Sequence, residues 1–150
     1  MRKALLILVP ALAASAIGFL IHVSTLGPIT QWVSQRMTGQ HMDRDSPIVT
    51  ATAFLTSIEI GIGIVVVYLL LRKALPVANI WLRALVLCVL LLAVQGRLIR
   101  QPLMDLLIGN PLSVVTLQDG ITYSLWLAMS IVVVVLIETL DRRFAPHGRT

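Results

Sequence analysis

The feature that most constrains this chain is an apolar run at residues 48–71, which carries one carboxylate, Glu59, near its middle. A helix of about 24 residues rises roughly 36 Å, which is enough to cross a hydrocarbon core of about 30 Å with some tilt. Glu59 would then lie near the bilayer midplane, where a charged side chain costs roughly 2.5 to 3.5 kcal/mol on insertion scales. The fold must therefore shield, pair or protonate this side chain.

Three further apolar runs have similar lengths, and the four together predict an all-α integral membrane protein. The expected transmembrane helices cover 4–26, 48–71, 80–98 and 121–140. The chain is 57% hydrophobic and 13% charged, whereas soluble domains are roughly 25% charged. The connections are short, so we expect residues 1–150 to form a single membrane domain, an up-down bundle of four transmembrane helices.

Two segments between these runs predict short amphipathic interfacial helices on the outer side of the membrane. In residues 28–37, apolar positions recur at helical spacing and include Trp32. Residues 99–109 extend the third transmembrane helix, with leucines on one side, polar groups on the other and Pro102 at the bend. Tryptophan favours the headgroup region of a bilayer. The expected interfacial anchors are Trp32, Trp81 and Trp126.

The basic residues predict the orientation of the bundle. The side that holds both termini carries eight of them, namely Arg2, Lys3, Arg72, Lys73, Arg83, Arg142, Arg143 and Arg149. The other side carries four, Arg36, Arg44, Arg97 and Arg100. Because cytoplasmic loops are enriched in Lys and Arg, we expect both termini in the cytoplasm of a bacterial-type inner (plasma) membrane. The net charge of +5 is scattered over the chain, which argues against nucleic acid as a partner and suits contact with anionic lipids.

The intramembrane polar site is expected on one face of the second transmembrane helix. Thr52, Thr56 and Glu59 share this face at 100° per residue, and Gln95 on the third helix is a candidate hydrogen-bond partner. In one interpretation the carboxyl group takes up and releases a proton or cation in step with a substrate. In the other, a protonated Glu59 bonds Thr56, Gln95 or a partner chain and holds the helices together.

A second polar constellation lies at the outer end of the third helix and consists of Arg97, Arg100, Gln101 and Asp105. Guanidinium groups match phosphate and carboxylate, so this constellation predicts contact with an anion or a lipid headgroup. The alternative is that both arginines extend to the headgroups and only anchor the helix end. An enzyme acting on a lipid headgroup would combine these groups with His41, Asp43 and Asp45. The sequence leaves open whether Arg97 points into the bundle.

No Walker A loop, GxSxG or HExxH motif occurs in the sequence. An enzyme is therefore the less expected class, and no metal or cofactor is expected. The first functional hypothesis is an accessory, assembly or inhibitory subunit that binds another membrane protein through its helix bundle and outer interfacial segments. The alternative is a homo-oligomeric, proton- or cation-coupled small transporter or channel centred on Glu59.

Overall fold

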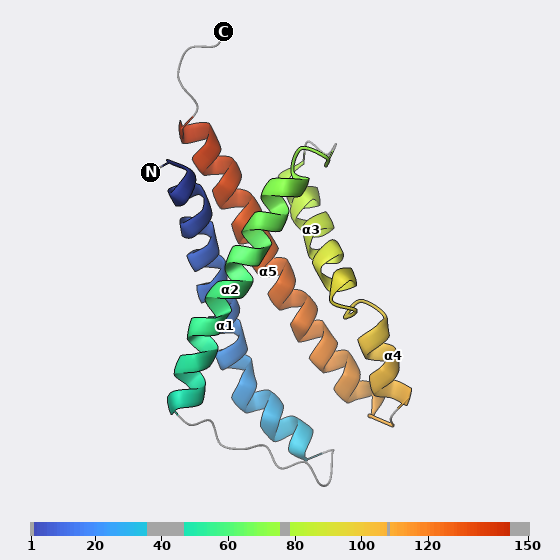
Figure 1. The fold of residues 1–150 in the computed structure, drawn as a ribbon. Coiled ribbons are helices and arrows are strands. Elements are labelled where there is room, and N and C mark those ends of the chain that lie inside the picture. The colour runs from blue at the N-terminus through green and yellow to red at the C-terminus, as the bar shows by residue number, and fades with distance from the viewer. Residues whose placement is uncertain (1, 36–46, 76–78, 108, 145–150) are drawn as a thin grey trace.

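The structure is a computed structural model that describes residues 2–35, 47–75, 79–107 and 109–144; the side chains of residues 2, 3, 34, 47–50 and 52–56 lie outside this description. The described part of the chain forms five α-helices and contains no strand (Figure 1). The helices are α1 (Arg2–Ser34), α2 (Pro47–Leu71), α3 (Ile80–Val94), α4 (Arg100–Leu107) and α5 (Leu112–Phe144). The predicted all-α class is confirmed for these residues.

Helix α5 is the centre of the arrangement. It packs extensively against α1 and α3, and more briefly against α2 and α4. Helix α1 also packs along α2, whereas α2 and α3 have little contact with each other. The four long helices alternate in direction, so both chain termini lie at the same end of the molecule (Figure 1). We call this end, marked by Phe144, the terminal end, and the opposite end, where α4 lies, the loop end.

Helices α1 and α2 approach each other closely through small residues. The Ser15 hydroxyl donates a hydrogen bond to the carbonyl oxygen of Ser57 at 2.9 Å. A Cβ atom at position 61 would overlap Ser15 Oγ and the Ala11 carbonyl oxygen, so the contact requires Gly61. The small residues of the two helices therefore bring the backbones together. Gly63 has open space beside it instead.

The hydrophobic core lies in the half of the molecule nearest the terminal end. Its buried residues come from the second half of α2, from both halves of α3 and mainly from the second half of α5, where they pack with the first half of α1. They include Ala11, Ala14, Ile64, Val65, Tyr68, Leu87, Cys88, Val133, Val134 and Ile137. In the half nearest the loop end the buried residues include Val33, Val114 and Val115, and the cavities described below lie there.

The separate interfacial helix expected over 28–37 is not found in the described residues, because α1 runs without a break through Pro28 to Ser34. Proline usually ends a helix at the preceding residue, since its ring clashes with that residue's Cβ. The preceding residue is Gly27, which has no Cβ, so this clash is absent at Pro28; α1 also continues through Pro10, which follows Val9.

The third apolar run is divided where the sequence predicted a continuous helix over 80–98 with a bent extension over 99–109. Helix α3 ends at Val94, and the positive φ of Gly96, 68°, turns the chain. A separate helix, α4, follows and stops before Gly109, whose φ is 91°. The break thus comes from Gly96, upstream of Pro102, which lies inside α4 and was expected to form the bend.

Two helices of the described chain are long and apolar enough to cross a membrane. They correspond to Ala4–Val33 in α1 and Leu112–Phe144 in α5, and the shorter apolar helices are Ser57–Leu71 and Ile80–Val94. Helix α5 starts earlier than the expected span over 121–140, because residues 112–120 are helical as well.

Candidate functional site

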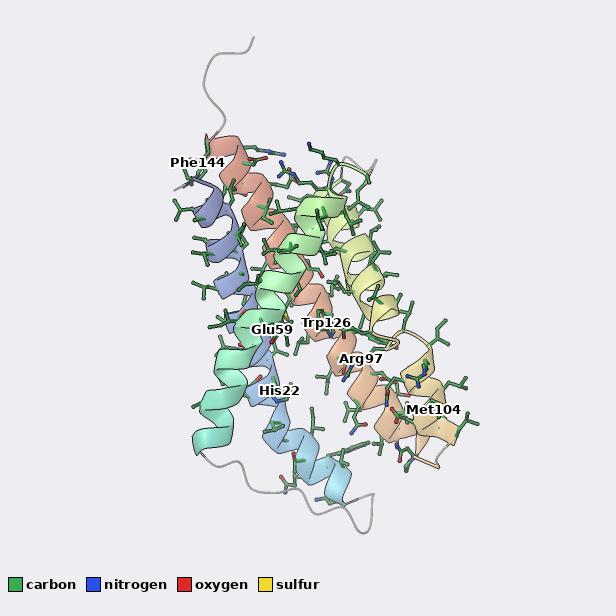
Figure 2. All side chains as sticks on the ribbon, in the orientation of Figure 1. His22, Glu59, Arg97, Met104, Trp126 and Phe144 are labelled. Atoms are coloured by element: carbon green, nitrogen blue, oxygen red, sulfur yellow. The ribbon has the colours of Figure 1, made fainter. Side chains whose placement is uncertain are left out.

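A cleft of about 930 Å³ lies between the helices on the loop-end side of the core. Helices α1, α2, α3 and α5 all contribute to it, together with the turn that follows α3. Figure 2 shows the labelled side chains of His22, Glu59, Arg97 and Trp126 around this space. The polar and aromatic lining comprises His22, Thr25, Glu59, Gln95, Arg97, Thr122 and Trp126. Its deep end is apolar and includes Ile64, Val67 and Leu91.

Glu59 lies in the middle part of α2 and faces this cleft. Its side chain is exposed, and no hydrogen bond or ion pair joins it to the part of the chain that the structure describes. Gln95, its predicted partner, lines the same cleft at the end of α3 without a side-chain bond to Glu59. Thr52 and Thr56 belong to α2, but their side chains fall outside the described residues. The structure therefore brings Glu59 and Gln95 to one cavity.

Arg97 occupies a well-defined position on the opposite wall. Its backbone N–H bonds the Leu92 carbonyl at 2.9 Å and the Gly96 N–H bonds Ala93 at 3.0 Å, the pattern of a glycine-terminated helix end. The Tyr123 hydroxyl of α5 lies 3.1 Å from the carbonyl oxygens of both Arg97 and Leu98. Arg97 lines the same cleft as Glu59.

A second, smaller cavity of about 450 Å³ adjoins the cleft toward the loop end. The two cavities share His22, Thr25, Arg97, Ile121 and Thr122. The smaller one is also lined by Gln101, Asp105, Gln118 and Asp119. The Gln101 amide nitrogen donates to the two Asp105 carboxylate oxygens at 3.1 and 3.2 Å.

Three of the four residues of the predicted outer constellation thus meet at this smaller cavity. Arg97, Gln101 and Asp105 line it, whereas Arg100 is exposed and lines neither cavity. The other proposed enzyme groups, His41, Asp43 and Asp45, lie outside the described residues.

A network of polar side chains joins α2, α3 and α5 near the terminal end. Glu138 Oε1 of α5 accepts hydrogen bonds from the Tyr68 hydroxyl of α2 at 2.7 Å and from the Arg83 guanidinium of α3 at 3.0 Å. Arg72, just after α2, pairs with Asp141 of α5 at 2.7 Å. We call the group Tyr68, Arg83 and Glu138 the inner network. It joins three helices, two of which otherwise have little contact.

Sequence reasoning missed the inner network, because the spacing of Glu138 and Arg142 suggested an ordinary pair along one helix. The available signal was different. Arg83 at the start of the third run and Glu138 at the end of the fourth must lie at the same end of an up-down bundle. Tyr68, one turn before the end of the second run, reaches the same level.

The three tryptophans occupy different environments. Trp81 is exposed at the start of α3, beside the Asn79 side chain that caps this helix. Trp32 is half-buried and lines cavities between α1 and α5. Trp126 is only 9% exposed and forms part of the cleft wall. In the structure Trp126 therefore belongs to the site.

The cleft presents a carboxylate, a guanidinium, an imidazole and an amide on an apolar wall, which is a set suited to binding a charged ligand. Within the described ranges, no three His, Cys, Asp or Glu side chains are grouped to hold a metal ion. Comparison of the chain with models of protein families, with curated proteins and with solved structures finds no match.

Proposed function

We propose that this chain is a four-helix membrane protein in which α1, α2, α3 and α5 cross the bilayer. Many large apolar side chains are exposed on their outer faces; Leu70 is 74% and Val94 87% exposed. An apolar surface of this extent suits contact with lipid. Helix α2 has 25 residues and rises roughly 37 Å. Helix α3 has 15 residues and rises about 22 Å, so the turn and α4 complete its passage to the interface.

The orientation that we propose places the terminal end in the cytoplasm of a bacterial-type inner membrane. The loop end, with α4 and the smaller cavity, then faces the outer side. Two observations support this. The termini lie together (Figure 1), and their side of the bundle carries most of the basic residues. Helix α4, with one polar and one apolar side, suits the outer interface.

Within this frame, the protein is a small proton- or cation-coupled transporter whose site is the cleft around Glu59. The observation that carries this proposal is the meeting of Glu59, His22 and Arg97 in one cavity, where none of the three side chains forms a hydrogen bond or ion pair with the described part of the chain. Charged groups at membrane depth are costly and are retained for substrate or proton pathways. A cavity of about 930 Å³ falls in the range of small-molecule sites, roughly 300 to 1,000 Å³.

The ends of the molecule differ in a way that fits one state of an alternating-access cycle. The cleft and the smaller cavity lead from Glu59 toward the loop end. In the other direction, the buried core, with Ile64, Tyr68 and Val133 fully buried, separates Glu59 from the terminal end. The inner network then joins α2, α3 and α5 beyond that core. This is an outward-open arrangement with a closed inner side.

The second candidate function is the accessory subunit that binds another membrane protein. It is favoured by the arm formed by α3 and α4, which packs on α5 and has little contact with α2. Its apolar side chains Val94, Ile99 and Leu107 are highly exposed. Purification in mild detergent distinguishes the candidates, because an accessory subunit is recovered with a stoichiometric partner and a transporter is recovered as this chain alone or as its oligomer.

Cysteine labelling tests the cleft and its direction. Gly63 lines the cleft and has open space beside it, so Gly63→Cys in a Cys88→Ala background introduces a probe without overlap. A membrane-impermeant maleimide is expected to label this variant from the outer side. The matched control is Val65→Cys, two residues away and fully buried, which is expected to stay unlabelled. Equal protection of both cysteines from the outer side would refute an outward-open cleft.

Ion flux tests the transport function itself. Purified protein in liposomes is tested for movement of protons or monovalent cations down an imposed gradient, first alone and then with the zwitterions described below, because a coupled carrier moves ions only with its substrate. Flux above that of empty liposomes is expected in one of the two conditions, and Glu59→Gln, which removes the carboxylate, is expected to abolish it. Flux at the level of empty liposomes in both conditions, or unchanged flux after Glu59→Gln, contradicts coupling through Glu59.

A further inference from the structure

We propose that the ligand of the cleft is a zwitterion, which binds its cationic group at Glu59 and its anionic group at Arg97. This inference rests on the proposed function and adds the chemical class of the ligand to it.

Charge balance is the first argument. Glu59 projects from α2 and Arg97 from the turn after α3, and both line one cavity. No ion pair joins them, and neither side chain forms a hydrogen bond or ion pair with the described residues. Asp119 in the smaller cavity interacts with Arg97 through space only. Figure 2 shows Glu59 on α2 and Arg97 apart from it, on the turn after α3. Within the cleft, a ligand with one charge would neutralise only one of the two side chains, and would meet a like charge on the other. A zwitterion satisfies both.

The separation of the two charges is fixed by the fold, which is the second argument. Helix α2 is held against α1 by the close contact at Gly61. The turn that carries Arg97 is held by the bonds of its own helix end and by the Tyr123 hydroxyl. Glu59 and Arg97 therefore do not approach each other freely. A pre-formed pair of opposite charges selects ligands by the distance between their own charges.

The apolar part of the cleft lining is the third argument. It includes Ile60, Ile64, Leu125 and Trp126, and Figure 2 shows Trp126 between Glu59 and Arg97. A ligand that spans from Glu59 to Arg97 therefore meets apolar surface, and its connecting part is expected to be aliphatic. Gln95 and Thr122 add an amide and a hydroxyl to the lining. Amino acids with separated charges and the phosphoethanolamine headgroup of a lipid share this chemistry.

Binding of a homologous series tests the inference. The probes are the ω-amino acids from glycine to 8-aminooctanoate, with pentylamine and pentanoate as singly charged controls matched to 5-aminopentanoate. Binding is measured by titration calorimetry in nanodiscs and by the fluorescence of Trp126 in a Trp32→Phe, Trp81→Phe background. We expect affinity to peak at one chain length, and the best zwitterion to bind at least about tenfold more tightly than either matched control.

Variants test which residue binds which charged group of the ligand. Glu59→Gln and Arg97→Gln are each expected to weaken binding of the best zwitterion about tenfold. Glu59→Gln is expected to keep or raise the affinity for pentanoate, because it removes a like charge, and Arg97→Gln is expected to keep or raise the affinity for pentylamine for the same reason. Arg100→Gln is the matched control, because Arg100 lies on the same arm and lines neither cavity; it is expected to bind as the parent does.

The outcomes separate this inference from the proposed function. If pentylamine binds as tightly as every zwitterion and this binding depends on Glu59, the zwitterion proposal is wrong. The proposal of a cation-coupled transporter is not contradicted by that result. The zwitterion proposal is also wrong if no ω-amino acid binds, glycerophosphoethanolamine does not bind, and the protein shows no preference for phosphatidylethanolamine over phosphatidylglycerol nanodiscs. Binding of the free compounds identifies a soluble zwitterion, whereas a preference for phosphatidylethanolamine alone identifies a lipid headgroup. Failure of Gly63→Cys labelling, by contrast, refutes the outward-open cleft itself.

Discussion

Removal of the inner network tests how much its hydrogen bonds contribute to the stability of the protein. Glu138 Oε1 accepts from Tyr68 at 2.7 Å and from Arg83 at 3.0 Å, so one carboxylate oxygen serves two helices. Tyr68→Phe removes one donor, Glu138→Ala removes the common acceptor, and the double variant completes a thermodynamic cycle.

The structure sets the size of each effect on the free energy of unfolding. A hydrogen bond to a charged group contributes about 1.5 to 3 kcal/mol, so Tyr68→Phe is expected to cost about 2 kcal/mol. The Arg83–Glu138 pair retains side-chain exposures of 23% and 20%, so its loss adds only about 1 kcal/mol. Glu138→Ala is therefore expected to cost about 3 kcal/mol. The double variant should cost about the same, because the bond to Tyr68 is lost only once, which gives a coupling energy of about 2 kcal/mol.

Reversible unfolding of the purified protein in mixed micelles measures these values. The control is Thr139→Val, since the Thr139 hydroxyl bonds the Val135 carbonyl within α5; a change below about 0.5 kcal/mol is expected for such an exposed position. If Tyr68→Phe and Glu138→Ala prove additive, with a coupling energy below about 0.5 kcal/mol, the two side chains do not share a bond and the reasoning is wrong.

Two further predictions concern packing around the cleft. Gly61→Ala should lower stability by about 1 to 3 kcal/mol, because its Cβ meets the Ala11 backbone, which cannot rotate away; Gly63→Ala, inside α2 with open space beside it, should leave stability unchanged or raise it by up to about 1 kcal/mol in the same unfolding assay. Tyr123→Phe removes the bonds to the Arg97 and Leu98 carbonyls and should speed amide exchange in the turn at least about fivefold, from a loss of about 1 kcal/mol. Equal costs for both glycines, or unchanged exchange in the turn, would contradict these contacts.

Much of the fold was predictable because apolar periodicity determines where long helices form. The second run, expected at 48–71, corresponds to α2 at Pro47–Leu71. The boundaries failed where backbone chemistry competes with hydropathy. Gly27 allows α1 to pass Pro28, and Gly96 ends the third helix before its apolar pattern stops. Glycine thus has opposite effects at these two positions. The helix continues past Gly27, whereas the positive φ of Gly96 ends the helix.

Individual residues of the site could be predicted from the sequence, but their positions relative to one another could not. Glu59 and Gln95 were recognised as polar residues inside apolar runs, and both reach the cleft. Helical projections do not give the depth at which two helices meet, so the position of Arg97 opposite Glu59 was undetermined. His22 was not among the predicted site residues, yet it lines both cavities. Contacts between helices distant in sequence decide these placements.

Helix α5 connects the two ends of the molecule and so links the cleft to the inner network. It carries Trp126 on the cleft wall, Tyr123 beneath the turn of Arg97, and Glu138 in the inner network. Helices α2 and α3, which bear Glu59 and the turn of Arg97, have little contact except through this network. A ligand that bridges Glu59 and Arg97 therefore joins, at the cleft, the same two helices that Glu138 joins at the other end. In the transporter that we propose, α5 is the common support against which α2 and α3 would move when one end opens and the other closes.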